Sequence, residues 1–303
     1  MLVKHLQAEI TTYCNSHCGG CIRNNQGGEC VVSLQHMPVE TFRKINFDEI
    51  ETMSFSGGYG EPTMHPHALV IFNSIPNDII WELHSNGGTR TKEWWEELAK
   101  IQHDNCSVVF SIDGLEDTNH IYRRGVDFNK IMDNAEAFIS AGGTAEWKFI
   151  SFKHNEHQIE AASKIAKEMG FNCFMVAESY KDEIYQKQYK GFPESKATRG
   201  YFTDRYNFAK QIEKKKHFPK HKKDKGCSWA NVNRAQIDAW GYIWRCCFHV
   251  GFHTQPYYKE LLLFDMKNNL NEYSYNDILE STFFDDIFDP VIKSCLECKS
   301  YVQ

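Results

Sequence analysis

Three cysteines near the start of the chain, Cys14, Cys18 and Cys21, have the spacing C-x3-C-x2-C. Thiolates are soft ligands that suit an iron–sulfur cluster or zinc. Both centres usually take four ligands, so three thiols in one short loop leave one coordination position for another molecule. The alternative is three unrelated buried thiols, which their confinement to eight residues with two glycines argues against.

Four later cysteines form a second group. Cys227 and Cys246 lie on either side of a glycine, and Cys295 and Cys298 follow with the spacing C-x2-C. Four thiolates with this spacing would suit a zinc ribbon as well as an iron–sulfur cluster. The N-terminus lacks the apolar segment of a signal peptide, so we expect a cytoplasmic protein. In a reducing compartment, grouped cysteines are more often metal ligands than disulfides.

Polar and glycine-rich turns follow several expected strands. Glycines let the backbone approach a ligand closely, a glutamate can accept hydrogen bonds from an ammonium group, and an arginine can clamp a carboxylate. Serine and aspartate side chains can hold a ribose. The residues at these turns are Gly58, Gly60, Glu61, Ser85, Asn86, Ser111, Asp113, Arg123 and Arg124. Together they describe a site for a ligand with an amine, a carboxylate and a ribose.

The elements that would position these residues alternate regularly through the first 180 residues. We expect strands at 6–10, 51–56, 79–84, 107–112, 147–152 and 173–177. Helices are expected at 38–45, 67–75, 92–101, 129–141 and 159–169. Alternating β and α units with short connections form a parallel sheet. Six units predict an open, partial (β/α)6 TIM-like barrel with its site at the carboxyl ends of the strands.

The remaining chain divides into two parts by composition. Residues 181–226 form a connecting segment, in which 214–225 carries seven lysines and one aspartate. Residues 227–303 carry a hairpin pattern at 235–240 and 242–246, then a helical stretch at 275–288. We therefore expect a barrel domain over 1–180, a connecting segment, and a small C-terminal domain over 227–303.

Composition excludes several classes of protein. Apolar residues make up 42% of the 303 residues, which is typical of a globular chain. The chain contains no apolar run long enough to span a membrane. The net charge of −6 argues against a general nucleic-acid binder. The lysine-rich run 214–225 has two interpretations: a solvated linker, or a docking surface for an acidic partner such as a flavodoxin-type reductant or RNA.

In its motifs, the chain resembles the radical S-adenosylmethionine (SAM) enzymes. That resemblance implies a [4Fe–4S] cluster on Cys14, Cys18 and Cys21, with SAM as the remaining ligand. It implies that SAM is held by Gly58, Gly60, Glu61, Ser85, Asn86, Ser111, Asp113 and one of Arg123 and Arg124. The second cysteine group resembles the twitch extension, a shortened SPASM domain. This implies one auxiliary [4Fe–4S] cluster on Cys227, Cys246, Cys295 and Cys298.

The resemblance implies the type of reaction but does not identify the substrate. SAM would be reductively cleaved to a 5′-deoxyadenosyl radical, which abstracts hydrogen from a sugar-like or nucleotide-linked small molecule in a net oxidation. A flavodoxin- or ferredoxin-type donor would supply the electron. One alternative is a peptide-modifying maturase of ribosomal peptides. A second is a non-catalytic iron–sulfur or zinc protein that binds RNA. No residue identifies the catalytic proton acceptor.

Overall fold

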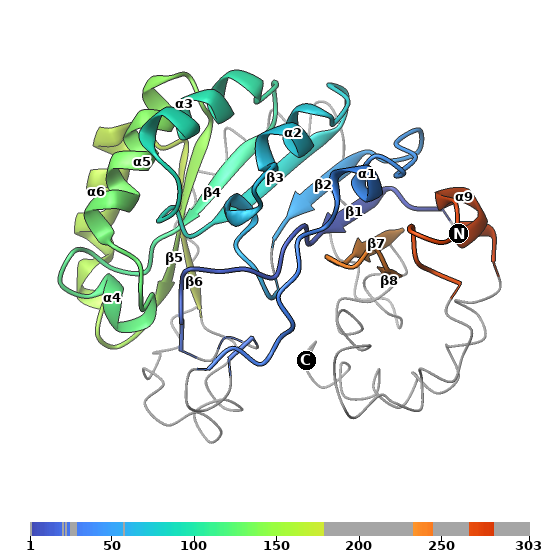
Figure 1. The fold of residues 1–303 in the computed structure, drawn as a ribbon. Coiled ribbons are helices and arrows are strands. Elements are labelled where there is room, and N and C mark those ends of the chain that lie inside the picture. Colours follow the sequence, from blue (N-terminus) through green and yellow to red (C-terminus); the bar gives the residue numbers. More distant parts are fainter. Residues whose placement is uncertain are drawn as a thin grey trace, which may run out of the picture.

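The structure is a computed structural model that describes residues 2–19, 21, 23–24, 29–56, 58–178, 233–244 and 267–281. These residues form an eight-stranded sheet with the spatial order β6-β5-β4-β3-β2-β1-β7-β8 (Figure 1). The strands are β1 (His5–Ala8), β2 (Thr52–Phe55), β3 (Ile80–Ser85), β4 (Ser107–Ser111), β5 (Ala145–Ser151), β6 (Cys173–Glu178), β7 (Arg234–Ile237) and β8 (Ile243–Trp244). Strands β1 to β6 pair in parallel in chain order, which confirms the predicted α/β alternation.

The helices are α1 (Val39–Phe42), α2 (Ala68–Asn73), α3 (Lys92–Ile101), α4 (Asn119–Tyr122), α5 (Phe128–Ser140), α6 (Ile159–Met169) and α9 (Tyr275–Glu280), with 3-10 turns η1 (Pro62–Met64) and η2 (Glu156–Gln158). Helices α3, α5 and α6 lie together on one side of the sheet (Figure 1). Asp127 caps the start of helix α5, because its side chain accepts a hydrogen bond from the Lys130 amide. Helix α6 ends at Gly170, which takes the left-handed conformation that glycine adopts without strain. None of the described helices has the length and apolar character needed to cross a membrane.

The two faces of the sheet differ in character because successive strand side chains point to opposite sides. One set of alternate positions is fully buried in the apolar core shared with the helices, and includes Leu6, Phe55, Leu83, Phe110, Trp147 and Ile237. The intervening positions are mostly polar: Gln7, Ser54, Glu82, Ser111 and Lys148 are half-buried, whereas Glu146, Gln236 and the apolar Val109 are buried. The sheet therefore carries a dry face under the helices and a polar face on its other side.

The hairpin β7–β8 continues the sheet beyond β1. Strand β7 pairs in parallel with β1, with Leu6 opposite Ala235, and β8 pairs antiparallel with β7. Strand β7 ends at Ile237, earlier than the predicted 240, because Asp238 turns the chain, whereas 245–246 of the second predicted strand lie outside the described residues. The Asp238 carboxylate accepts hydrogen bonds from the amides of Trp240 and Tyr242, each at 3.0 Å. The division into three parts stays a prediction, since most of 181–303 lies outside the described residues.

Candidate functional site

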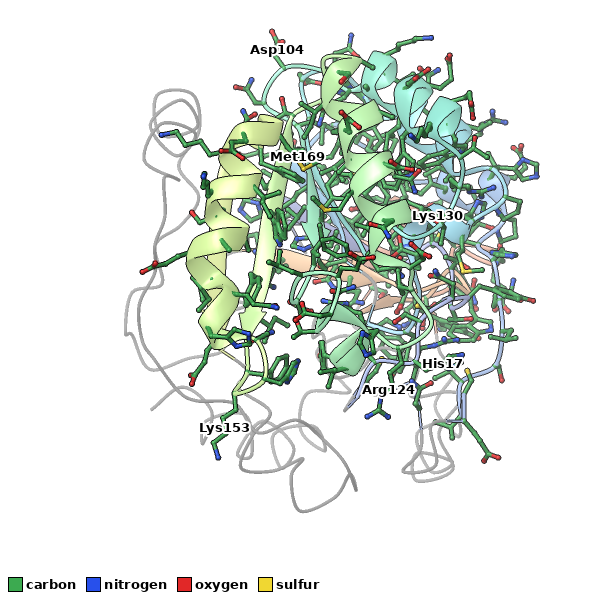
Figure 2. The ribbon with its side chains drawn as sticks, turned by 90° about the vertical axis from the view of Figure 1, so that its left-hand side faces the viewer. His17, Asp104, Arg124, Lys130, Lys153 and Met169 are labelled. Carbon is green, nitrogen blue, oxygen red and sulfur yellow. The ribbon has the colours of Figure 1, made fainter. Side chains whose placement is uncertain are left out.

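The loop with the first three cysteines lies at the carboxyl edge of the sheet, beside the turns that follow β3 and β4. The Asn86 side chain donates a hydrogen bond to the Asn15 side chain at 2.8 Å. The His17 amide donates to the Arg124 carbonyl, also at 2.8 Å. Figure 2 shows His17 and Arg124 side by side, at the edge opposite Asp104. As predicted, strand ends far apart in the sequence meet at one edge.

Cys14, like the other two thiols of the loop, is half-buried. Its sulfur accepts a hydrogen bond from the Ser16 amide at 3.4 Å and lies 3.9 Å from the Asn86 side-chain nitrogen. Burial raises the pKa of the Cys14 thiol to about 12, and the nearby Glu61 carboxylate adds to the shift. Because the thiolate is the form that binds metal, a metal centre here would have to displace this proton.

Cys18 and Cys21 lie half-buried in the same loop. The Cys18 sulfur lies 2.9 Å from the Ser16 hydroxyl and 3.8 Å from the Arg123 guanidinium. Three thiols in one loop are a donor set that suits an iron–sulfur cluster. In the described part of the chain, no three His, Cys, Asp or Glu side chains are gathered closely enough to hold a metal ion. The assignment of these cysteines as cluster ligands stays a prediction from residue type and spacing.

Glu61 joins the glycine-rich turn after β2 to the end of β3. Its Oε1 accepts hydrogen bonds from the Thr63 hydroxyl and the Ser85 hydroxyl, both at 2.7 Å. Its Oε2 accepts from the Asn86 amide at 2.7 Å. Burial raises the pKa of Glu61, while these donors act in the opposite direction. The sequence predicts that Ser85 and Asn86 lie near Glu61, but not that their donors occupy its carboxylate. Since a carboxylate oxygen has two lone pairs, Oε2 can still accept from a ligand.

The glycine-rich turn approaches the backbone of the chain that follows β1. A Cβ atom added to Gly60 would lie 2.6 Å from the Thr11 carbonyl carbon, and would overlap the carbonyl oxygen. The Glu61 amide donates to the Tyr13 carbonyl at 2.7 Å. Gly58 lies half-buried in the same turn. Gly60 is therefore required by close packing against the protein's own backbone.

Asp113 and Arg123 form an ion pair behind the cysteine loop. The Arg123 Nε lies 2.6 Å from one Asp113 carboxylate oxygen, and the other oxygen accepts from the Ile150 amide at 2.6 Å. The Asp113 side chain is fully buried, whereas that of Arg123 is 16% exposed. Burial alone would lower the pKa of Arg123, but the Asp113 and Cys18 charges more than offset it and raise the pKa.

The two arginines that the sequence leaves as alternatives have different surroundings. Arg123 is held by Asp113 and stands over the Tyr122 ring at 5.3 Å. Arg124 is exposed, and its Nε donates to the Ile121 carbonyl at 3.3 Å. Ser111, the other residue predicted on this strand, ends β4 on the polar face and is half-buried. Which arginine contacts SAM stays a prediction, although the Arg123 guanidinium lies 3.8 Å from the Cys18 sulfur.

Two buried charged residues at this edge are absent from the sequence-predicted site. Glu9 follows β1, and its Oε1 accepts from the amides of Tyr59 and Gly60 in the glycine-rich turn. The Arg23 guanidinium donates to the carbonyls of Thr12, at 3.0 Å, and Cys14, at 3.2 Å. A charged residue within an apolar strand pattern is the signal that could have identified Glu9.

A comparison with known protein families identifies the family of this chain. Residues 8–166, more than half of the chain, match the family model described as the radical SAM superfamily. The chain belongs to the radical SAM superfamily. The matched segment contains the three cysteines, the glycine-rich turn and the Asp113–Arg123 pair, so the predicted family is confirmed.

The chain is also similar to individual known proteins. A tungsten-containing aldehyde ferredoxin oxidoreductase cofactor-modifying protein of Pyrococcus furiosus is 30% identical over 129 residues. The match covers 41% of this chain and only 34% of that protein. Streptococcus suis SuiB bound to S-adenosylmethionine matches the fold with a TM-score of 0.62 and 18% identity, over 93% of this chain and 67% of SuiB. Native anSMEcpe with bound AdoMet gives 0.54 and 15%, over 93% of this chain and 82% of that chain.

The remaining predicted features are untested. Cys227, Cys246, Cys295 and Cys298 lie outside the described residues, as does the lysine-rich run 214–225. The twitch domain, the auxiliary cluster and the role of the lysines therefore stay predictions.

Proposed function

We propose that this protein is an enzyme that cleaves SAM reductively and uses the resulting radical to oxidise a small molecule. The observation that carries the proposal is the joining of the cysteine loop to the glycine-rich turn through Asn86. Its backbone amide binds Glu61, while its side chain binds Asn15 and lies against Cys14. A ligand held by the glycine-rich turn would therefore adjoin the thiols.

The residues that would hold the cofactors follow from this geometry. Cys14, Cys18 and Cys21 would hold a [4Fe–4S] cluster, and the glycine-rich turn with Glu61 would receive the amine of SAM. When bound, the cluster and SAM supply a 5′-deoxyadenosyl radical able to abstract hydrogen from an unactivated C–H bond. Gly60 and Glu61 would orient the amine, and the Asp113–Arg123 pair provides a fixed charge pair beside Cys18.

The substrate is proposed as a sugar-like or nucleotide-linked small molecule that binds the polar face of the sheet. A peptide substrate is the second candidate, because one SuiB structure with the same fold is described as bound to the precursor peptide SuiA. That structure matches 95% of this chain with a TM-score of 0.63, but at 16% identity the match concerns the fold alone. We further propose one auxiliary cluster on the second cysteine group, and a flavodoxin- or ferredoxin-type electron donor.

Anaerobic reconstitution followed by turnover tests the proposed chemistry. The dithionite-reduced protein should release 5′-deoxyadenosine from SAM, and a variant with Cys14, Cys18 and Cys21 all replaced by alanine should release none. Iron analysis should give about eight irons per chain, from two four-iron clusters, and about four in the variant. A protein with an intact cluster that releases no 5′-deoxyadenosine would support the non-catalytic alternative.

The two substrate classes are separable without knowing the substrate. Small-molecule and peptide fractions of a cell extract are added separately to the reduced enzyme, and the rate of 5′-deoxyadenosine release is followed. Acceleration by the small-molecule fraction that survives protease treatment supports the first class. Acceleration that protease treatment abolishes supports a peptide substrate.

A further inference from the structure

Glu9 is a buried carboxyl group at the carboxyl end of β1, beneath the glycine-rich turn. It is 1% exposed. Its Oε1 accepts a hydrogen bond from the Gly60 amide at 3.1 Å and a second one from the Tyr59 amide. Both amides belong to the turn that also carries Glu61. One oxygen atom thus binds two successive backbone groups of the turn.

Three alternate residues of the segment after β1 meet this turn. Glu9 binds the Tyr59 and Gly60 amides, the Thr11 carbonyl packs against Gly60, and the Tyr13 carbonyl accepts from the Glu61 amide. Thr11 and Tyr13 contribute only backbone atoms, which any residue type would supply. Glu9 contributes its side chain, so it is the member of this contact that depends on residue type.

The second carboxyl oxygen of Glu9 has a different environment. Its Oε2 is buried and has no hydrogen-bond partner among the described residues. Glu9 lies beside Asp238, because the Glu9 amide donates to the Ile237 carbonyl at 2.9 Å. Burial raises the pKa of Glu9 to about 8, and the Asp238 charge adds to this. A neutral carboxyl group keeps Oε1 as an acceptor, so the amide of glutamine is a close substitute.

We propose that Glu9 is a positioning residue that fixes the glycine-rich turn, Gly58 to Glu61, in the conformation that binds SAM. This inference rests on the proposed function, in which the turn receives the SAM amine. The same contact joins the turn to β1, the strand that leads directly into the cysteine loop. Glu9 thereby sets the position of the turn relative to the thiols.

The test compares three variants of the full, anaerobically reconstituted chain. Glu9→Ala removes the acceptor, Glu9→Gln keeps it, and Gln236→Ala removes a buried polar side chain from the same face of neighbouring β7. The dissociation constant for SAM is measured by equilibrium dialysis at equal iron content. We expect Glu9→Ala to weaken SAM binding by about tenfold to a hundredfold, since a lost buried hydrogen bond costs about 1–3 kcal/mol. Glu9→Gln and Gln236→Ala should stay within about threefold of wild type.

A second readout needs no cofactor. In the unloaded protein, amide hydrogen exchange at residues 58–61 should accelerate in Glu9→Ala but not in Glu9→Gln or Gln236→Ala, because the Tyr59 and Gly60 amides lose their acceptor. If Glu9→Ala does not fold, Glu9→Asp replaces it, since its carboxyl group is one methylene too short to bind both amides. It should then weaken SAM binding at least fivefold.

The outcomes separate this inference from the proposed function. A wild-type protein that carries its cluster but binds no SAM would overturn the proposed function. Unchanged SAM affinity and unchanged exchange at 58–61 in Glu9→Ala, with SAM bound by wild type, would overturn the role of Glu9 alone. If Glu9→Ala and Gln236→Ala lose SAM affinity equally, Glu9 contributes only to general stability, and the inference is refuted.

Discussion

The contact between Gly60 and the chain after β1 makes Gly60→Ala a sharp test of the site. The added Cβ would lie 2.6 Å from the Thr11 carbonyl carbon, inside the 3.0 Å that real Cβ atoms keep. The Thr11 backbone cannot retreat easily, because the Thr12 amide next to it donates to the Gln35 carbonyl at 2.9 Å. The carbonyl oxygen would lie closer still, so the turn must move by about 1.5 Å before ordinary van der Waals contact is restored.

That movement has a calculable effect on SAM binding. The hydrogen bond between the Gly60 amide and Glu9 is already 3.1 Å long, so a shift of about 1.5 Å breaks it. The lost hydrogen bond contributes about 1 kcal/mol, and the displaced turn costs about as much again through strain. A total of about 2 kcal/mol corresponds to a roughly thirtyfold weaker affinity for SAM.

The assay measures SAM affinity and thermal stability together, with Gly142→Ala as the matched control. No atom lies within 4 Å of a Cβ at Gly142, but its φ of +95° makes alanine strained. Gly142→Ala should therefore lose about 1–2 kcal/mol of folding stability while keeping wild-type SAM affinity. The reasoning fails if Gly60→Ala binds SAM as tightly as wild type, or if the control weakens binding as much.

Three further predictions concern buried carboxylates. Arg123→Ala should lower the free energy of unfolding, measured in urea, by about 3 kcal/mol, because Asp113 would remain buried without its cation. The control Arg124→Ala, at an exposed residue, should change it by less than about 0.5 kcal/mol. Similar losses in the two variants would contradict the ion-pair argument. Glu61→Gln should destabilise by about 1–3 kcal/mol, because in either orientation its NH2 group would face a backbone donor, the Asn86 or the Thr63 amide. An unchanged melting temperature would be contrary to the observed hydrogen bonds. Burial raises the pKa of Glu9 from its ordinary 4.5 to about 8. Between these pH values the folded state keeps a proton that the unfolded chain releases, so the free energy of unfolding falls as the pH rises from 4.5 through 8. Glu9→Gln should flatten the dependence of melting temperature on pH in that window, and an equally steep profile would show that another group is responsible.

Most of the fold follows from periodicity in the sequence. Helix α6 begins and ends where the apolar spacing and Gly170 predict, because a left-handed glycine ends a helix locally. Strands β1 to β6 follow from short apolar runs between helices, and their order follows from the short connections. Helix α4, at Asn119–Tyr122, was missed because four residues carry no readable period.

The position of the hairpin could not be predicted from local pattern. The pairing of β7 with β1 joins residues more than 200 positions apart. Nothing in the residues of β7 identifies β1 as its neighbour, since any exposed parallel strand edge offers the same backbone groups. For the site, the sequence similarly predicts the residue types but not their hydrogen-bond partners. From the sequence, Glu61 is expected to be a free acceptor, whereas in the structure Ser85 and Asn86 already donate to it.

The site is best understood as a set of loops that hold one another. Asn86 binds Glu61 with its backbone and the cysteine loop with its side chain, while Arg123 connects Asp113 to Cys18. Each loop is thus fixed by its neighbours in addition to its own strand. A loop anchored only by its strand ends would be mobile on its own. Because these connections are mutual, a change at the turn after β2 reaches the thiols through Asn86. Substitutions of residues outside the predicted cofactor ligands should therefore affect SAM binding, and the variants of the buried Glu9 test this reasoning most directly.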